Sequence, residues 1–249
     1  MGVFDMFSKE RSRERNAGRA INKYAQSPDR LKAMQTLLGD GSPEALYAVM
    51  RRFGMLYDKT IDDEQEKEYL FDSLVEKGGV VLDPLKKYLL AADSISWPLR
   101  VLDKVVATKD EVVDVLAEVM KRHEPGYERD PTKKIQLLNH LAALKDKRVP
   151  PLVTPYLTDM DEGVRYAAVE ALVRQGDEAA AAATLVEQLT KPEEESLRLR
   201  IRIADGFAEL GWSLGERRAE VEKRLPDAFT IEGRGKEPAR IKKKPAPKE

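Results

Sequence analysis

The sequence predicts an all-α protein, an α-solenoid of about six antiparallel helix pairs, and two observations lead to this prediction. Candidate first helices begin near residues 28, 62, 96, 130, 161 and 194, so the steps between them are 34, 34, 34, 31 and 33 residues. A nearly constant period of this length with two helices per period is typical of an α-solenoid. The composition agrees, because 35% of the residues are charged and only 6% are aromatic, which suits many surface-rich helices better than a sheet.

The clearest helix pair lies between residues 161 and 193. One apolar stripe at helical spacing consists of Val164, Ala168 and Leu172. Gly176 is the expected C-terminal stop of this helix, and Asp177 is the expected N-cap of the next one. A pair this short needs like units stacked on each side to bury its apolar faces.

The first pairs along the chain begin with similar signals. Ser27-Pro28 and Ser42-Pro43 each predict an N-cap followed by proline at the first helical position. The expected starts of the next helices are Asp62, Asp83-Pro84, Ser96 and about Asp110. Each of these segments continues with apolar residues at a spacing of three or four, which indicates an amphipathic helix.

The last pairs follow the same rule with two irregularities. The fourth pair opens at Asp130-Pro131, and its second helix, from about 151 to 157, is short. The sixth pair starts near Glu194 with LRLRIRI, whose alternation would suit a strand. We interpret it as helix because helical spacing resumes through Phe207 and Leu210. A last helix is expected between Gly215 and Pro226.

Three regions are predicted: a leading helix over 1–26 that caps the array, the repeat array over 27–226, and a tail over 227–249. The tail is rich in Lys and Pro and almost free of large apolar groups, so we expect it to be disordered. Residues 1–7 contain Val3, Phe4, Met6 and Phe7 before a charged flank. Weak peripheral membrane contact through 1–7 is therefore the alternative to capping.

The stretch DEGVRYAAVEALVRQGDEAA, from Asp161 to Ala180, resembles the HEAT-repeat consensus, with an acidic turn, Val-Arg, small residues and Gly-Asp. The resemblance is clearest over residues 159–190. Weaker matches fill the Val-Arg slot with Leu99-Arg100, Lys133-Lys134 and Leu199-Arg200. The resemblance implies a right-handed superhelix whose second helices line a concave binding face. It also implies that Asp161 caps the inter-repeat turn and that Arg165 reaches back to that turn.

Basic residues recur where second helices end, and this basic ladder is the candidate partner-binding site. Its members, with one tyrosine at the matching position, are Arg51, Arg52, Lys86, Lys87, Lys121, Arg122, Tyr156 and Lys191. One interpretation is a groove for an acidic peptide or a phosphate backbone. The other is that cations simply suit the negative ends of helix dipoles, and the same dipole effect accounts for the acids at helix starts.

No catalytic, metal-binding or cofactor-binding motif is present, so we expect no enzyme activity and no cofactor. The chain has no Cys, and its two histidines, His123 and His140, lack metal-ligand spacing. The net charge of −1 favours no particular class of partner. No apolar run is long enough for a transmembrane helix or a signal peptide, so we expect a cytoplasmic protein.

The favoured function is a non-enzymatic scaffold or adaptor that binds another protein or peptide on its concave surface. The alternative is a nucleic-acid-binding array that uses the basic edge and the Lys-rich tail, including a HEAT-like DNA glycosylase. A third alternative is the phycobilin-lyase branch of HEAT-like proteins, although no residue of this chain specifies a bilin site.

Overall fold

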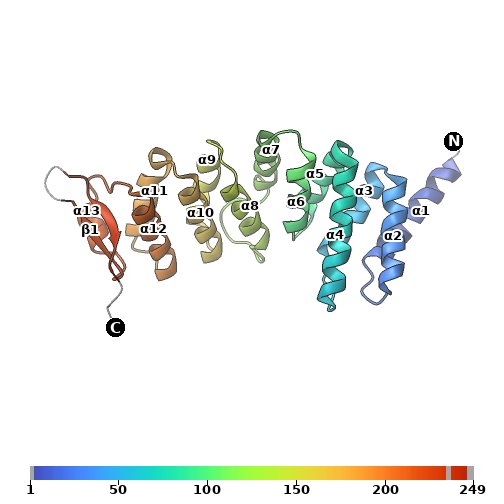
Figure 1. The fold of residues 1–249 in the computed structure, drawn as a ribbon, viewed down its shortest axis with the longest axis horizontal. Coiled ribbons are helices and arrows are strands. Elements are labelled where there is room, and N and C mark those ends of the chain that lie inside the picture. The colour runs from blue at the N-terminus through green and yellow to red at the C-terminus, as the bar shows by residue number, and fades with distance from the viewer. Residues whose placement is uncertain (1–2, 234–236, 246–249) are drawn as a thin grey trace. The chain divides into compact units, whose positions relative to one another are not determined.

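The computed structural model describes residues 3–233 and 237–245, with side chains from residue 8 onward. Helices follow one another as antiparallel pairs, and a β-hairpin lies near the C-terminus (Figure 1). The predicted all-α solenoid of helix pairs is confirmed, apart from this hairpin. The proposed membrane contact of residues 1–7 depends on side chains that lie outside the described ones.

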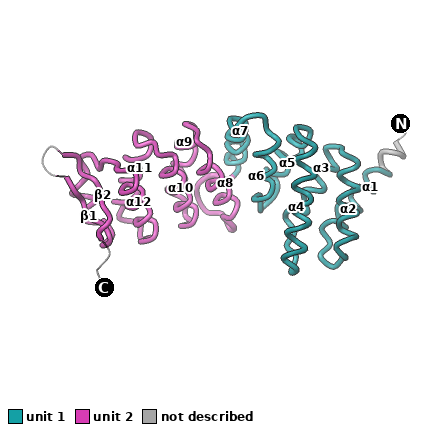
Figure 2. Tube along the Cα trace, in the orientation of Figure 1, with its two compact units in different colours: residues 1–122 teal, residues 123–249 magenta. Residues whose placement is uncertain are grey.

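The chain divides into two compact units, residues 1–122 and 123–249 (Figure 2). Unit 1 begins with α1 (Val3–Ala20). Its three helix pairs are α2 (Ser27–Asp40) with α3 (Pro43–Met50), α4 (Thr60–Lys77) with α5 (Leu82–Ala91), and α6 (Ser96–Val105) with α7 (Lys109–Met120). The 3₁₀ turns η1 (Arg51–Gly54) and η2 (Gly78–Val81) connect them. The first helices α2, α4 and α6 stack on one another, as do the second helices α3, α5 and α7.

Unit 2 repeats this arrangement. Its pairs are α8 (Thr132–Ala143) with α9 (Val149–Val153) and η3 (Thr154–Thr158), α10 (Glu162–Gln175) with α11 (Glu178–Thr190), and α12 (Leu197–Leu210) with α13 (Arg218–Glu222). The stretch LRLRIRI is helical, as interpreted from the sequence. Helices α10 and α12 approach closely at Gly206, where an added Cβ would lie 2.6 Å from Val173 Cγ2.

Side chains and glycines mark many helix ends in the way that the sequence indicates. The side chains of Ser42, Asp161 and Asp177 each accept a backbone N–H in the first turn of the helix that follows. Gly176 ends α10 in the left-handed conformation, with φ of 73°. The prediction for Ser27 is wrong, because it lies inside α2 and its hydroxyl instead donates to Glu66.

Helix α1 packs against α2 and α3 at the start of the array. Ala17 and Ala20 of α1 are buried in this contact, and Arg13 forms an ion pair with Asp40 at the end of α2. The described part of α1 therefore covers apolar surface of the first pair, as a capping helix does in a solenoid.

Unit 1 buries a group of charged side chains around Glu66 of α4. Arg30 of α2 donates to both carboxylate oxygens, with Nη2 2.7 Å from Oε1. Arg52 of η1 donates through Nε to Oε2 at 2.9 Å, and through Nη2 to Asp63 at 2.7 Å. Arg30 and Arg52 are fully buried, and Glu66 is 4% exposed. The first helix pair is thereby joined to the second through charged hydrogen bonds.

Glu66 stays ionised in this setting. Burial alone would raise the pKa of Glu66, but hydrogen bonds from Arg30, Ser27 and Arg52 outweigh burial and hold the pKa below its usual value. A carboxyl whose pKa is lowered by folding stabilises the fold above its unfolded pKa of about 4.3, and this stabilisation is lost as the pH falls through the folded pKa.

The tail does not follow the prediction of disorder. β1 (Phe229–Glu232) pairs antiparallel with β2 (Arg240–Lys243), and Ile231 lies opposite Ile241. β2 packs against α12, with Ile241 fully buried and Phe229 3% exposed. The tail has few large apolar residues, but these are the ones that face the core, and the lysines around them stay exposed.

The first testable prediction concerns Glu66. Glu66→Gln should lower the free energy of unfolding at neutral pH by about 3–5 kcal/mol, because buried Arg30 loses its ionic partner and buried Arg52 keeps only Asp63. The difference between variant and wild type should shrink as the pH falls below about 4, where the wild type loses its own carboxylate. Urea denaturation across a pH series measures this. Glu64→Gln, on the exposed face of α4, is the control, and an equal effect there would contradict the account.

The second prediction concerns the hairpin. Ile241→Ala should lower the unfolding free energy by about 2–5 kcal/mol, because it empties a buried site against α12. Lys242→Ala, at the neighbouring exposed position, should stay within about 0.5 kcal/mol of the wild type. Chemical denaturation followed by circular dichroism compares them. If Ile241→Ala and Lys242→Ala both leave the unfolding free energy unchanged, the tail is disordered, as the sequence predicts.

Candidate functional site

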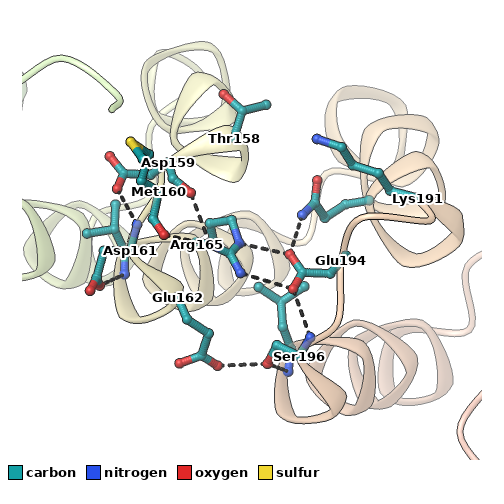
Figure 3. A network of polar contacts seen from close by, with 12 residues as sticks. Thr158, Asp159, Met160, Asp161, Glu162, Arg165, Lys191, Glu194 and Ser196 are labelled. Carbon is teal, nitrogen blue, oxygen red and sulfur yellow. Dashed lines mark hydrogen bonds and ion pairs between the residues drawn. The ribbon is translucent and has the colours of Figure 1, made fainter. Parts of the chain in front are cut away.

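The inter-repeat turn of unit 2 that the sequence singles out is a polar network (Figure 3). Asp161 caps α10 by accepting the N–H of Val164 at 3.0 Å. Arg165 Nη1 reaches back to the carbonyl oxygens of Asp159 and Met160, at 3.0 and 3.2 Å. Both roles agree with those that the HEAT resemblance implies.

Arg165 also binds an acid that the sequence analysis missed. Its Nε and Nη2 donate to the two carboxylate oxygens of Glu194, at 2.8 and 3.0 Å (Figure 3). Gln188 and the backbone N–H of Ser196 donate to the same carboxylate. Burial opposes ionisation of Glu194, but these hydrogen bonds hold its pKa below the usual value. Glu194 belongs to the run Glu193-Glu194-Glu195 near the start of α12, one of the groups of acids at helix starts that the helix dipole alone was expected to explain.

The turn before α10, which also contains Asp161, holds a second pair of this kind. Lys134 of α8 donates to Asp159 at 2.9 Å, and both side chains are buried. Burial again works to raise the pKa of Asp159, but hydrogen bonds from Lys134 and from the N–H groups of Asp161 and Gly126 keep it lowered. The contact between Lys134 and Asp159 joins the first helix α8 to the turn that leads into the next first helix, α10. These contacts stabilise the fold and offer no reactive group to a substrate.

The structure corrects the basic ladder at two positions. Arg52 is fully buried and is bound by Glu66 and Asp63, so it cannot contact a partner. Tyr156 is 4% exposed, and its hydroxyl donates to the carbonyl oxygen of His123 at 2.9 Å. Sequence spacing predicts that both residues lie near the end of a second helix, as they do. It does not predict whether their side chains are buried or exposed.

The other ladder members remain at least partly exposed. Arg51, Lys86 and Lys191 each line a different groove between helices. Lys87 lies over the ring of Tyr47, 5.0 Å from its centroid. Lys121 forms an exposed ion pair with Glu118 at 2.6 Å, and Arg122 is exposed at the end of unit 1. The remaining cations therefore belong to separate local environments.

The groove between the second helices α5 and α7 is the candidate functional site. It lies within unit 1 and encloses about 500 Å³, a volume in the range of ligand pockets, roughly 300–1,000 Å³. Its apolar lining consists of Leu82, Leu90, Val115 and Val119. Its polar lining consists of Lys86, Glu111, Asp114 and Glu118. An apolar floor with charged groups at the edge is the usual composition of a protein-binding groove.

The other grooves are more polar. One lies near the ends of α3 and α5 and is lined by Tyr47, Arg51 and Tyr88, among others. In unit 2, Thr158 and Lys191 (both labelled in Figure 3) line a groove with Arg217, which pairs with Glu220. On the first helices, the groove between α2 and α4 is lined mainly by polar side chains. The α5–α7 groove is thus the most apolar of the grooves described here.

The comparisons with known proteins identify a repeat family for the middle of the chain. Residues 113–204 match the family model of HEAT repeats, a match that runs from α7 to α12. No curated protein and no solved structure matches the chain significantly. Among the described residues, no helix has the length and apolar character that crossing a membrane requires.

Proposed function

We propose that this chain, whose residues 113–204 are HEAT repeats, is a non-enzymatic scaffold that binds a partner protein or peptide on the face formed by its second helices. Stacked helical repeats present extended surfaces of this kind for binding. The family match supports a helical scaffold or protein-interaction module, and the choice of face rests on the grooves of the structure.

The observation that carries the proposal is the contrast between the buried carboxylates that join repeats and the second helices. Glu66 in α4, and Asp159 and Glu194 in inter-repeat turns, are saturated by hydrogen bonds from the chain itself. The α5–α7 groove, in contrast, combines apolar surface with charged groups at its edge. Apolar area that water must otherwise cover is the main source of free energy in protein association.

The alternative, a nucleic-acid-binding array, receives less support. Arg52 is buried, so Arg51 is the one exposed arginine at that position of the basic ladder. Lys121 is paired with Glu118. The α5–α7 groove is edged by three carboxylates, which would repel a phosphate backbone. Exposed lysines of the hairpin, such as Lys242 and Lys244, are the feature that would favour nucleic acid.

Site-specific photo-crosslinking in the native cell tests the proposal. A benzoylphenylalanine in place of Lys86, on α5, should give a protein adduct of defined mass. The same residue in place of Glu68, on α4 of the same repeat, should not, because both positions are exposed but only Lys86 faces the groove. Adducts at Glu68 without adducts at Lys86, or at neither, would contradict the proposal. An adduct that nuclease removes would support the nucleic-acid alternative.

A further inference from the structure

We propose that the α5–α7 groove binds a basic amphipathic helix of the partner, with apolar residues on its floor and basic residues against α7. This inference rests on the proposed function and names the chemistry of the partner. It also reverses the charge that the basic ladder predicts, because that ladder suggests an acidic peptide.

The floor of the groove has the length of two helical turns. Leu82 and Leu90 lie eight residues apart on one row of α5, with the charged Lys86 midway between them. At 1.5 Å per residue this row spans about 12 Å, or roughly two turns. A partner helix in such a groove inserts apolar side chains at positions i, i+3 or i+4, and i+7. Leu82 and Leu90 are only half-buried in the structure, so a partner would remove further apolar surface from water.

The opposite edge of the groove is acidic. Glu111, Asp114 and Glu118 lie at positions i, i+3 and i+7 of α7 and so share one face of that helix. Lys86 of α5 faces this edge and Lys121 pairs with Glu118 at 2.6 Å, so three carboxylates stand against two ammonium groups. The potential at the α7 edge is therefore negative, and it selects basic residues on the nearer side of the partner helix.

This lining also separates a basic helix from the other occupants. An acidic peptide or a phosphate backbone would place its charges against three carboxylates, which costs affinity. An uncharged apolar helix would take water away from the acidic edge without supplying an opposite charge, which is also unfavourable. The basic amphipathic helix is the class of ligand that satisfies both the floor and the edge.

Fluorescence anisotropy with two synthetic peptides tests the inference on the full-length protein. The first is a labelled helix of about 14 residues, or four turns, with leucines along one stripe and lysines elsewhere. The second has glutamate in place of every lysine. The lysine peptide should bind at least about tenfold more tightly than the glutamate peptide, since several opposite-charge contacts replace like-charge ones. A preference for the glutamate peptide, or none, would overturn the inference.

Variants locate the binding. Asp114→Lys with Glu118→Lys should weaken the lysine peptide at least about tenfold and raise the affinity for the glutamate peptide. The matched control is Glu64→Lys with Glu68→Lys on the exposed face of α4, which should leave both affinities unchanged. An equal loss in the control would mean non-specific charge attraction and would overturn the inference. Leu90→Ser should weaken both peptides, and Leu82→Ser serves the same purpose if that variant fails to fold.

The two proposals can fail separately. Adducts at Lys86 in the cell without discrimination between the peptides would leave the scaffold function standing and overturn the basic-helix inference. If a short single-stranded DNA displaces the lysine peptide from the groove by binding to the protein itself, the inference is also overturned.

Discussion

Successive repeats are joined by carboxylates that are buried and ionised, Glu66 within α4 and Asp159 and Glu194 in inter-repeat turns. An isolated charge in a protein interior is very unfavourable, so such a group persists only where it is paired and fully hydrogen-bonded. Glu66, Asp159 and Glu194 each receive a cation from the first helix of the preceding repeat: Arg30, Lys134 and Arg165. The pairs hold only if neighbouring repeats keep their relative positions, because a shift would leave a buried charge without its partner. Apolar stacking alone is non-directional, so these pairs supply the positional constraint.

This constraint divides the polar groups of the protein into two sets. The polar side chains that join repeats, such as Arg52, are buried and hydrogen-bonded within the chain, so a partner cannot contact them. Those along α5 and α7 border a groove whose leucines are still partly in contact with solvent. The proposed function follows from this division. The match of residues 113–204 to HEAT repeats supports the proposed scaffold, and the lining of the groove is the basis for the proposed chemistry of its partner.

The sequence predicted the helices and their pairing, because these depend on local spacing. The resemblance to HEAT repeats implied that Asp161 caps the inter-repeat turn and that Arg165 reaches back to it, and both contacts are present. Of the three cations that bind the buried carboxylates, the sequence pointed to Lys134 and Arg165 but not to Arg30, and it identified none of the acceptors. The Val-Arg slot contains Lys134 and Arg165, which bind carboxylates, but also Arg100, which instead lies over the ring of Trp97 at 4.0 Å. The acceptors lie 25 and 29 residues further along the chain, a distance over which local pattern carries no information. The basic ladder was wrong at Arg52 because its partner Glu66 also lies outside the local pattern. The hairpin was missed because its strands, of four residues each, are too short to show a clear alternation.

A double-mutant cycle on Arg165 and Glu194 tests most directly whether buried ion pairs hold successive repeats together. Arg165→Leu, Glu194→Leu and the double variant are compared with the wild type by chemical denaturation. The account predicts that each single change costs several kcal/mol and that the double change costs less than their sum, with a coupling of about 1.5–3 kcal/mol. The exposed pair of Arg198 and Glu162, 3.4 Å apart, should show a coupling below about 1 kcal/mol. A coupling near zero for Arg165 and Glu194 would contradict the claim that buried charge pairs hold successive repeats in position.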